Sequence, residues 1–240
     1  MQCLNCGKET SGNFCQHCGQ KTSVEKLALK KEINNFLSSI TNFDKGIYKN
    51  IIGLTLNPKL TISNYLEGKR KYILNPLTYA FMMLTILVLI DQNFADHNLL
   101  NFEKRQFEID DNSISPFALG VDLGELMSNY FKYLWFLLIP VLAFWNWLFD
   151  AKKSYAEHIA INAFVVGHAA LITICCFIFY KRPIIFNGIL YFAVFLYTGI
   201  VYYKPNKKLD SLFHLLSPIM GFLALYTVPV LFFLLIRWLR

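Results

Sequence analysis

Four cysteines near the N-terminus have the spacing of a metal site. Two Cys-x-x-Cys-Gly segments, CLNCG and CQHCG, contribute Cys3, Cys6, Cys15 and Cys18, and eight residues separate the two pairs. Thiolates in such pairs usually bind zinc tetrahedrally, and the glycine after each pair gives the turn its backbone freedom. We therefore predict a zinc ribbon over residues 1–22 that holds one zinc ion per chain.

The chemistry of such a site is structural. A zinc ion with four cysteine ligands leaves no open position for water or substrate, which favours docking over catalysis. Because the segment is too short to bury a core of its own, bound metal would supply most of its folding free energy. Phe14 is the expected packing residue. Two disulfides or a disordered reduced tail are the alternatives, and His17 is a substitute ligand. We do not expect nucleic acid binding, because the head shows no stacking aromatics and few interleaved basic residues.

Polar side chains in the apolar part of the chain form a second candidate site. They are Glu157, His158, Asn162, His168 and His214. Such groups are costly inside a membrane and are functional candidates by default. His158 and Asn162 share a helical face, whereas His168 lies on another, so no single stripe collects the set. The alternative is structural: Glu157 and His158 bond to neighbouring loops, and His168 bonds to a backbone carbonyl.

The elements that hold these residues are predicted to be those of an all-α membrane protein. Apolar residues make up 55% of the sequence and charged residues only 16%, against about a quarter charged in soluble domains. Crossing about 30 Å of hydrocarbon takes about 20 helical residues. We expect a polytopic helical bundle over 75–240, with about five spans at 75–92, 131–149, 159–180, 184–203 and 212–238. The first is the shortest of them. Aromatic residues near span ends fit interfacial belts, among them Trp145, Trp147, Tyr202, Tyr203 and Trp238.

Charge before and after the first span predicts which side of the membrane each end occupies. A basic cluster at the cytoplasmic border consists of Lys69, Arg70 and Lys71. Asn75-Pro76 follows, where asparagine can cap and proline can open a helix. Residues 91–130 then hold eight Asp/Glu against two Lys/Arg. With the reduced thiols that zinc requires, this pattern predicts an integral membrane protein with its N-terminus cytoplasmic and its C-terminus outside.

Residues 23–74 are expected to be an amphipathic helical linker between head and bundle. Apolar residues recur at helical spacing over 24–56; they are Ile33, Leu37, Ile40, Ile47, Ile51 and Leu54. The linker lies either on an anionic membrane surface or under the transmembrane bundle. Asn57-Pro58 ends this helix, and a short second helix follows and ends at Gly68.

Three stretches resemble a known family. They are CLNCG…FCQHCGQ, NPKLTISNYLEGKRKYILNPLTYAF, and YAEH at Tyr155 to His158, and together they cover about half the chain. The chain is similar to a group of bacterial membrane proteins, common in Bacteroidetes and classed as a domain of unknown function, that join an N-terminal zinc ribbon to a hydrophobic region. Family members often carry further histidines after the Glu-His pair, where this chain has Phe164 and Val166. The resemblance implies an architecture and a location in the bacterial cytoplasmic membrane, but no activity.

Three functions are compatible with these patterns. A membrane-anchored interaction or scaffold protein, docking through its zinc ribbon to a protein partner or to a second copy, explains the strongest features. A small transporter or channel would need polar residues that converge between spans, such as Asn162, His168, Asn187 and His214. An intramembrane enzyme is the third alternative, but the chain has no GxSxG, HExxH or phosphate-binding glycine loop, and adjacent Glu157 and His158 diverge on a helix. We expect the lipid bilayer as a partner in every case.

Overall fold

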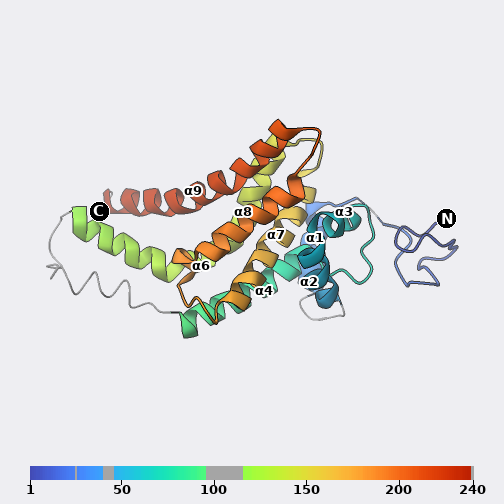
Figure 1. The fold of residues 1–240 in the computed structure, drawn as a ribbon, viewed down its shortest axis with the longest axis horizontal. Coiled ribbons are helices and arrows are strands. Elements are labelled where there is room, and N and C mark those ends of the chain that lie inside the picture. The colour runs from blue at the N-terminus through green and yellow to red at the C-terminus, as the bar shows by residue number, and fades with distance from the viewer. Residues whose placement is uncertain (25, 40–45, 96–115, 239–240) are drawn as a thin grey trace.

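The fold comes from a computed structural model that describes residues 1–24, 26–39, 46–95 and 116–238. Within those ranges the regular structure is all helical apart from two isolated β-bridges in the head, Gln2 with Glu9 and Phe14 with Lys21 (Figure 1). The helices are α1 (Leu29–Ser39), α2 (Gly46–Leu56), α3 (Pro58–Leu66), α4 (Pro76–Phe94), α6 (Pro116–Phe149), α7 (Tyr155–Cys176), the 3₁₀ helix η1 (Ile184–Phe186), α8 (Gly188–Tyr202) and α9 (Lys208–Trp238). The predicted all-α fold with a small N-terminal cysteine head is confirmed.

Four helices in the described part of the chain are long and apolar enough to cross a membrane. They are α4, the Phe131–Phe149 part of α6, α7, and the Leu209–Phe232 part of α9. α6 begins at Pro116, so the segment predicted to link the first two spans is helical at its C-terminal end. Its 34 residues measure about 51 Å, well beyond the about 30 Å of one hydrocarbon crossing.

The predicted fourth span, 184–203, is shorter than the sequence suggested. α8 begins at Gly188 and has 15 residues, or about 22 Å of helix. Asn187 sets this start, because its Oδ1 accepts a hydrogen bond from the N–H of Leu190 at 3.3 Å. The preceding residues form η1 instead of a longer helix. The shortest of the five apolar helices is therefore α8, and the expectation that it would be the first was wrong, since α4 has 19 residues.

α7 lies at the centre of the bundle, and 72% of its span is buried inside the protein. It packs against α4, α6 and α8 and also against the N-terminal helices. A Cβ atom at Gly167 would lie 2.8 Å from the Cα of Ala80, so α4 approaches α7 too closely for a side chain there. Ala163 and Ala170 are fully buried on the same helix. Small residues of α7 thus allow close packing.

Pairs of contacts define the two ends of the bundle. The hydroxyl of Tyr79 bonds to His168 at 3.0 Å, and Asp91 accepts from the N–H of Ile184 at 2.8 Å, so α4 runs beside α7 in the same direction. At the opposite end, Lys204 bonds to Asp150 at 2.7 Å and joins the turn after α6 to the turn after α8. The N-terminal head and the end of α9 lie at opposite ends of the molecule (Figure 1).

Helices α1 to α3 form a layer that packs on the bundle, where they contact α4, α7 and α8. The helical stripe predicted over 24–56 is divided between α1 and α2, and residues 40–45 lie outside the described ranges. Leu54 is 1% exposed, and Ile47 and Ile51 pack against the core, so α2 lies under the bundle.

The turns of this layer follow their capping residues. Asn57 caps α3 through the N–H of Leu60, and Gly68 ends it with φ +97°, as predicted. Asn75 caps α4 through the N–H groups of Leu77 and Thr78, also as predicted. These caps explain why the chain turns sharply between α2 and α4.

Candidate metal centre and buried polar cluster

Each Cys-x-x-Cys-Gly segment forms a tight knuckle. The N–H of Gly7 donates to the carbonyl of Cys3 at 2.8 Å, and the N–H of Gly19 donates to the carbonyl of Cys15 at 2.8 Å. Both glycines have positive φ angles, +74° and +69°, which a side chain would disfavour. The glycine after each cysteine pair is therefore required by the turn.

The two knuckles bring four thiols together. All four Sγ atoms lie within 4.8 Å of one another, with Cys3 to Cys18 and Cys6 to Cys15 each at 3.6 Å. A tetrahedral ion with sulfur ligands at about 2.3 Å needs sulfur atoms about 3.8 Å apart. The four cysteines can therefore hold a metal ion, and all four are free thiols.

Electrostatics at the knuckles favours a cation between the sulfurs. The backbone N–H groups of Cys18 and His17 donate to Cys15 and lower the pKa of its thiol to about 6. The backbone of Cys6 likewise lowers the pKa of Cys3. Although the N–H of Lys8 donates to Cys6, desolvation and the other three sulfurs raise the pKa of Cys6 to about 11. Full deprotonation of the set therefore needs a bound positive charge.

Gln20 fixes the cysteine head to the loop before α4. Its Nε2 donates to the carbonyl of Gly68 at 3.0 Å, and its Oε1 accepts from the N–H groups of Arg70 and Lys71 at 3.2 and 3.1 Å. The side chain of Gln20 is only 5% exposed. We call these three hydrogen bonds the Gln20 contact. Sequence analysis missed it, and its only signal was a polar residue directly after the second knuckle.

The side chains of the predicted basic cluster pack on the protein around this contact. Lys69 donates to Asn64 at 2.9 Å, and Arg70 donates to the carbonyl of Tyr65 at 3.2 Å and lies over its ring. Lys71 lies 5.3 Å from the ring centroid of Tyr72. The cluster thus forms the surface that the head rests on.

Three of the predicted intramembrane residues converge at one end of the bundle. His158 bonds through Nδ1 to the hydroxyl of Tyr202 at 2.8 Å, and Asn162 donates to the carbonyl of His158 at 2.8 Å. Asn146 donates to Asn162 at 3.2 Å and bonds to His214 at 2.8 Å. We call these five residues the buried polar cluster; none is more than 3% exposed.

The cluster has a defined proton arrangement. The carbonyl of Asp150 can only accept, so Nε2 of His158 donates to it at 3.1 Å and Nδ1 accepts from Tyr202. Nδ1 of His214 faces Oδ1 of Asn146, which leaves Nε2 of His214 as an acceptor. Within the described residues, that buried Nε2 has no hydrogen-bond partner. The cluster therefore presents one buried lone pair.

Sequence analysis did not predict that Asn146 and Tyr202 belong to the buried polar cluster. Asn146 could have been found as a lone amide inside an apolar span, FWNWLF. Tyr202 was expected in an interfacial belt, but it is 3% exposed and hydrogen bonded, so that expectation was wrong. Trp147 and Tyr203, at 40% and 51% exposed, fit the belt better.

The structure places the other predicted residues elsewhere. His168 bonds to the hydroxyls of Tyr79 and Thr55, at 3.0 and 3.2 Å, and so links α7 to α4 and α2. Glu157 accepts from the N–H of Ser154 at 2.7 Å and completes a capping box at the start of α7. Asn187 caps α8. These contacts hold helices in place.

An ion pair lies at the border of the cluster. The carboxylate of Asp150 lies 2.7 Å from Lys204 Nζ and 3.5 Å from Lys153 Nζ. Burial of Asp150 opposes its ionisation, but the hydrogen bond from Lys204 and the charges of both lysines outweigh it and lower its pKa to about 2. The turn after α6 is thereby tied to the turn after α8.

Comparisons with known proteins give no relative. No protein-family model, curated protein or solved structure matches the chain. The resemblance to the bacterial family therefore stays a prediction.

Proposed function

We propose that this chain is a membrane-anchored interaction protein that presents a zinc ribbon to a partner at the cytoplasmic face of a bacterial membrane. The Gln20 contact carries the proposal: it holds the head against the loop before α4 in one orientation. A module fixed at the bilayer gains effective concentration for a partner that also touches the membrane. The helical bundle then anchors and positions the head.

The partner would meet an exposed aromatic side chain on the head. Phe14, which the sequence suggested as a packing residue, is 61% exposed, and Met1 is 75% exposed. Exposed aromatic side chains are frequent anchors of protein interfaces. The other apolar side chain of the head, Leu4, is 49% exposed, and its end lies against Gly68, where the head contacts the loop before α4. Phe14 is therefore the anchor that the proposal names.

Zinc is the metal that the proposal assigns to the head. Four sulfur ligands at tetrahedral spacing suit zinc, whose closed structural sites have this composition. Purified protein should hold one zinc ion per chain, and the Cys3→Ser, Cys6→Ser double variant should hold almost none by elemental analysis. The Cys175→Ser, Cys176→Ser variant is the control and should keep its zinc. Equal zinc content in all three proteins would refute the site.

Site-specific crosslinking in intact cells tests the docking function. A photoreactive phenylalanine at position 14 should give a discrete adduct, and the same residue at position 179, which is 91% exposed at the other end of the bundle, should not. The adduct should disappear in the Cys3→Ser, Cys6→Ser background, because the ribbon loses its fold. An adduct of twice the chain mass would identify a second copy as the partner. No adduct, or the same adduct from both positions, would contradict docking.

The buried polar cluster favours a second candidate, a small transporter. Its residues come from α6, α7, α8 and α9, and Nε2 of His214 is a buried acceptor without a partner among the described residues. His214→Phe should then abolish a cellular phenotype that deletion of residues 1–22 leaves unchanged. The docking function predicts the reverse.

A further inference from the structure

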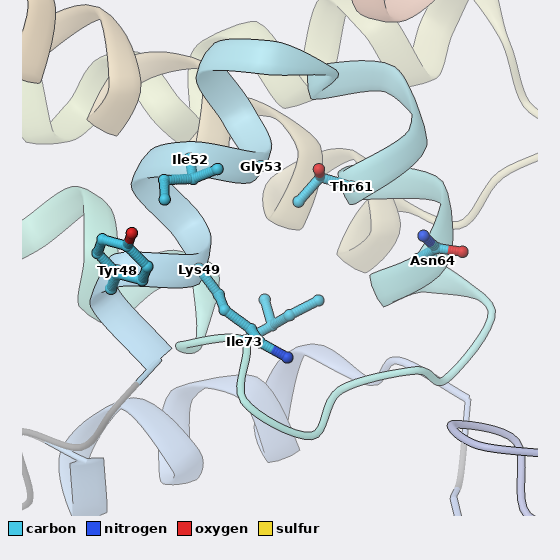
Figure 2. Close-up of a pocket in the computed structure, with 7 residues that line it drawn as sticks. All are labelled: Tyr48, Lys49, Ile52, Gly53, Thr61, Asn64 and Ile73. Atoms are coloured by element: carbon cyan, nitrogen blue, oxygen red, sulfur yellow. The ribbon is translucent and has the colours of Figure 1, made fainter.

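A pocket of about 320 Å³ lies between α2, α3 and the loop that leads into α4 (Figure 2). Its walls include Tyr48, Lys49, Ile52, Thr61, Asn64 and Ile73. At its back, a Cβ on Gly53 would lie 2.7 Å from the hydroxyl of Thr61, so glycine lets α2 and α3 close together there. The pocket combines an apolar floor with a polar rim.

Positive charge lies at the pocket and in the loop beside it. Lys49 belongs to the pocket wall, and its ammonium lies 4.6 Å from the ring centroid of Tyr72. The ammonium of Lys71, in the adjoining loop, lies 5.3 Å from the same ring, and that of Lys69 bonds to the pocket residue Asn64 at 2.9 Å and pairs with Glu67 at 3.4 Å. The charges of Lys49 and Lys71 raise the positive potential around the Tyr72 ring, and a bound anion would lower it.

Tyr72 adopts an unusual backbone conformation in the loop beside the pocket. Its φ angle is +67°, which is the left-handed region that bulky residues rarely occupy. Such strain persists only where surrounding contacts impose it, and it is concentrated at ligand sites. Here the strained backbone places the ring within reach of both Lys49 and Lys71.

An exposed apolar stripe runs from the pocket along α2 and onto α3. It consists of Tyr48, Ile52, Leu56 and Leu60, which are 71%, 37%, 78% and 55% exposed. Tyr48, Ile52 and Leu56 are spaced four residues apart on α2 and therefore share one face of that helix, opposite the face that packs on the bundle. Tyr48 and Ile52 belong to both the stripe and the pocket. A free phosphate would leave this stripe in water, whereas lipid chains would cover it.

We propose that this pocket binds the phosphate of an anionic phospholipid from the leaflet on the side of the metal centre. Lys49 and Lys71 hold the phosphate, and the acyl chains lie along the stripe formed by Tyr48, Ile52, Leu56 and Leu60. The loop between α3 and α4 thus makes two kinds of contact. Its backbone bonds to Gln20 of the head, and its side chains contact the lipid.

Native mass spectrometry of the full-length, zinc-loaded protein tests this site. In detergent with added dioleoyl-phosphatidylglycerol, wild type should retain one lipid about tenfold more than it retains dioleoyl-phosphatidylcholine. Lys49→Gln should remove this preference. Lys207→Gln, which changes an exposed lysine that pairs with Asp210 at 3.8 Å, is the matched control and should keep it.

Two further measurements keep the site falsifiable. Tyr72→Gly removes the ring, so it should lose lipid retention. It also removes the hydroxyl that donates to the carbonyl of Cys18 at 3.4 Å, so Tyr72→Phe, which lacks only that hydroxyl, should keep the lipid. Loss of the lipid in both variants would overturn the assigned role of the ring. Millimolar inorganic phosphate should not displace the lipid. Displacement by phosphate would overturn the lipid assignment in favour of a soluble anion, and equal losses in Lys49→Gln and Lys207→Gln would overturn the site.

Discussion

Single side chains in this protein connect parts that are distant in sequence. The amide of Gln20 reaches residues about fifty positions away, and its three hydrogen bonds are buried where the head meets the loop before α4. A hydrogen bond contributes about 1 kcal/mol net, but an unsatisfied buried group costs about 1–3 kcal/mol. The head has almost no core of its own, so its orientation depends on its contacts with this loop, and Gln20 makes three of them.

Replacing Gln20 should therefore release the head without unfolding it. In Gln20→Ala, the backbone amides of Arg70 and Lys71, which donate to Gln20, should exchange with solvent about tenfold faster, while zinc content stays at one per chain. Hydrogen exchange with mass spectrometry measures the amides, and elemental analysis measures the zinc. Gln16→Ala, which changes an exposed residue of the same head, is the control. Unchanged exchange at residues 70 and 71 would mean that other contacts seat the head.

Asp150 gives the membrane domain a defined response to acid. Its folded pKa of about 2 lies below the value of 3.8 for a free side chain, so it stabilises the folded protein above about pH 4. That contribution is lost as the pH falls from about 4 to 2. The melting temperature of wild type should exceed that of Asp150→Asn at pH 7, and the difference should shrink below pH 4. Asp210→Asn, in a longer and more exposed pair, should differ little from wild type.

The candidate sites were predictable to different degrees. The four cysteines are close in sequence, so their spacing alone predicted that they come together. The buried polar cluster combines α6, α7, α8 and α9, and helical periodicity describes only residues on one helix. His158 and Asn162 were therefore predicted as neighbours, whereas the approach of His214 depends on how α9 packs.

Helix ends in this chain follow local chemistry, and that part of the fold was predictable. Asn57-Pro58 and Asn75-Pro76 begin α3 and α4 as their capping and proline signals indicate. The late start of α8 at Gly188 was not predicted. Apolar composition marks the part that suits lipid, and a helix can stop short of that part.

The packing of α4 on α7 depends on one glycine. A Cβ at position 167 would meet backbone atoms of Ala80, which cannot move aside as a flexible side chain can. Gly167→Ala should lower stability by about 1–3 kcal/mol through overpacking, seen as a lower melting temperature in detergent. Gly188→Ala is the matched control, because a Cβ there meets no atom within 4 Å. Equal melting temperatures for the two variants would show that α4 shifts without cost.

For the whole molecule, the directions of the helices determine whether the two termini lie on the same side of the membrane. α4 and α7 run in the same direction, and the Asp150–Lys204 pair joins the end of α6 to the end of α8. If α8 crosses the bilayer despite its 15 residues, the chain crosses five times and its ends lie on opposite sides. A short helix is tolerated where the bilayer thins locally or flanking residues reach the interface. Tyr203, next to Lys204 at the end of α8, is 51% exposed and is available for such a role.

Reporter fusions test this topology. A cytoplasmic reporter should be active after residue 1 and inactive after residue 240, and an export-dependent reporter should show the reverse. A fusion in the turn at 181–182 should report the outside, and a fusion at 205–206 should report the cytoplasm, because α8 separates them. If both turns reported the same side, α8 would not cross, the zinc ribbon and the C-terminus would share a compartment, and the chain would have four spans. Opposite signals from these two turns, with the head inside, would give the five-span arrangement that the basic cluster before α4 predicts.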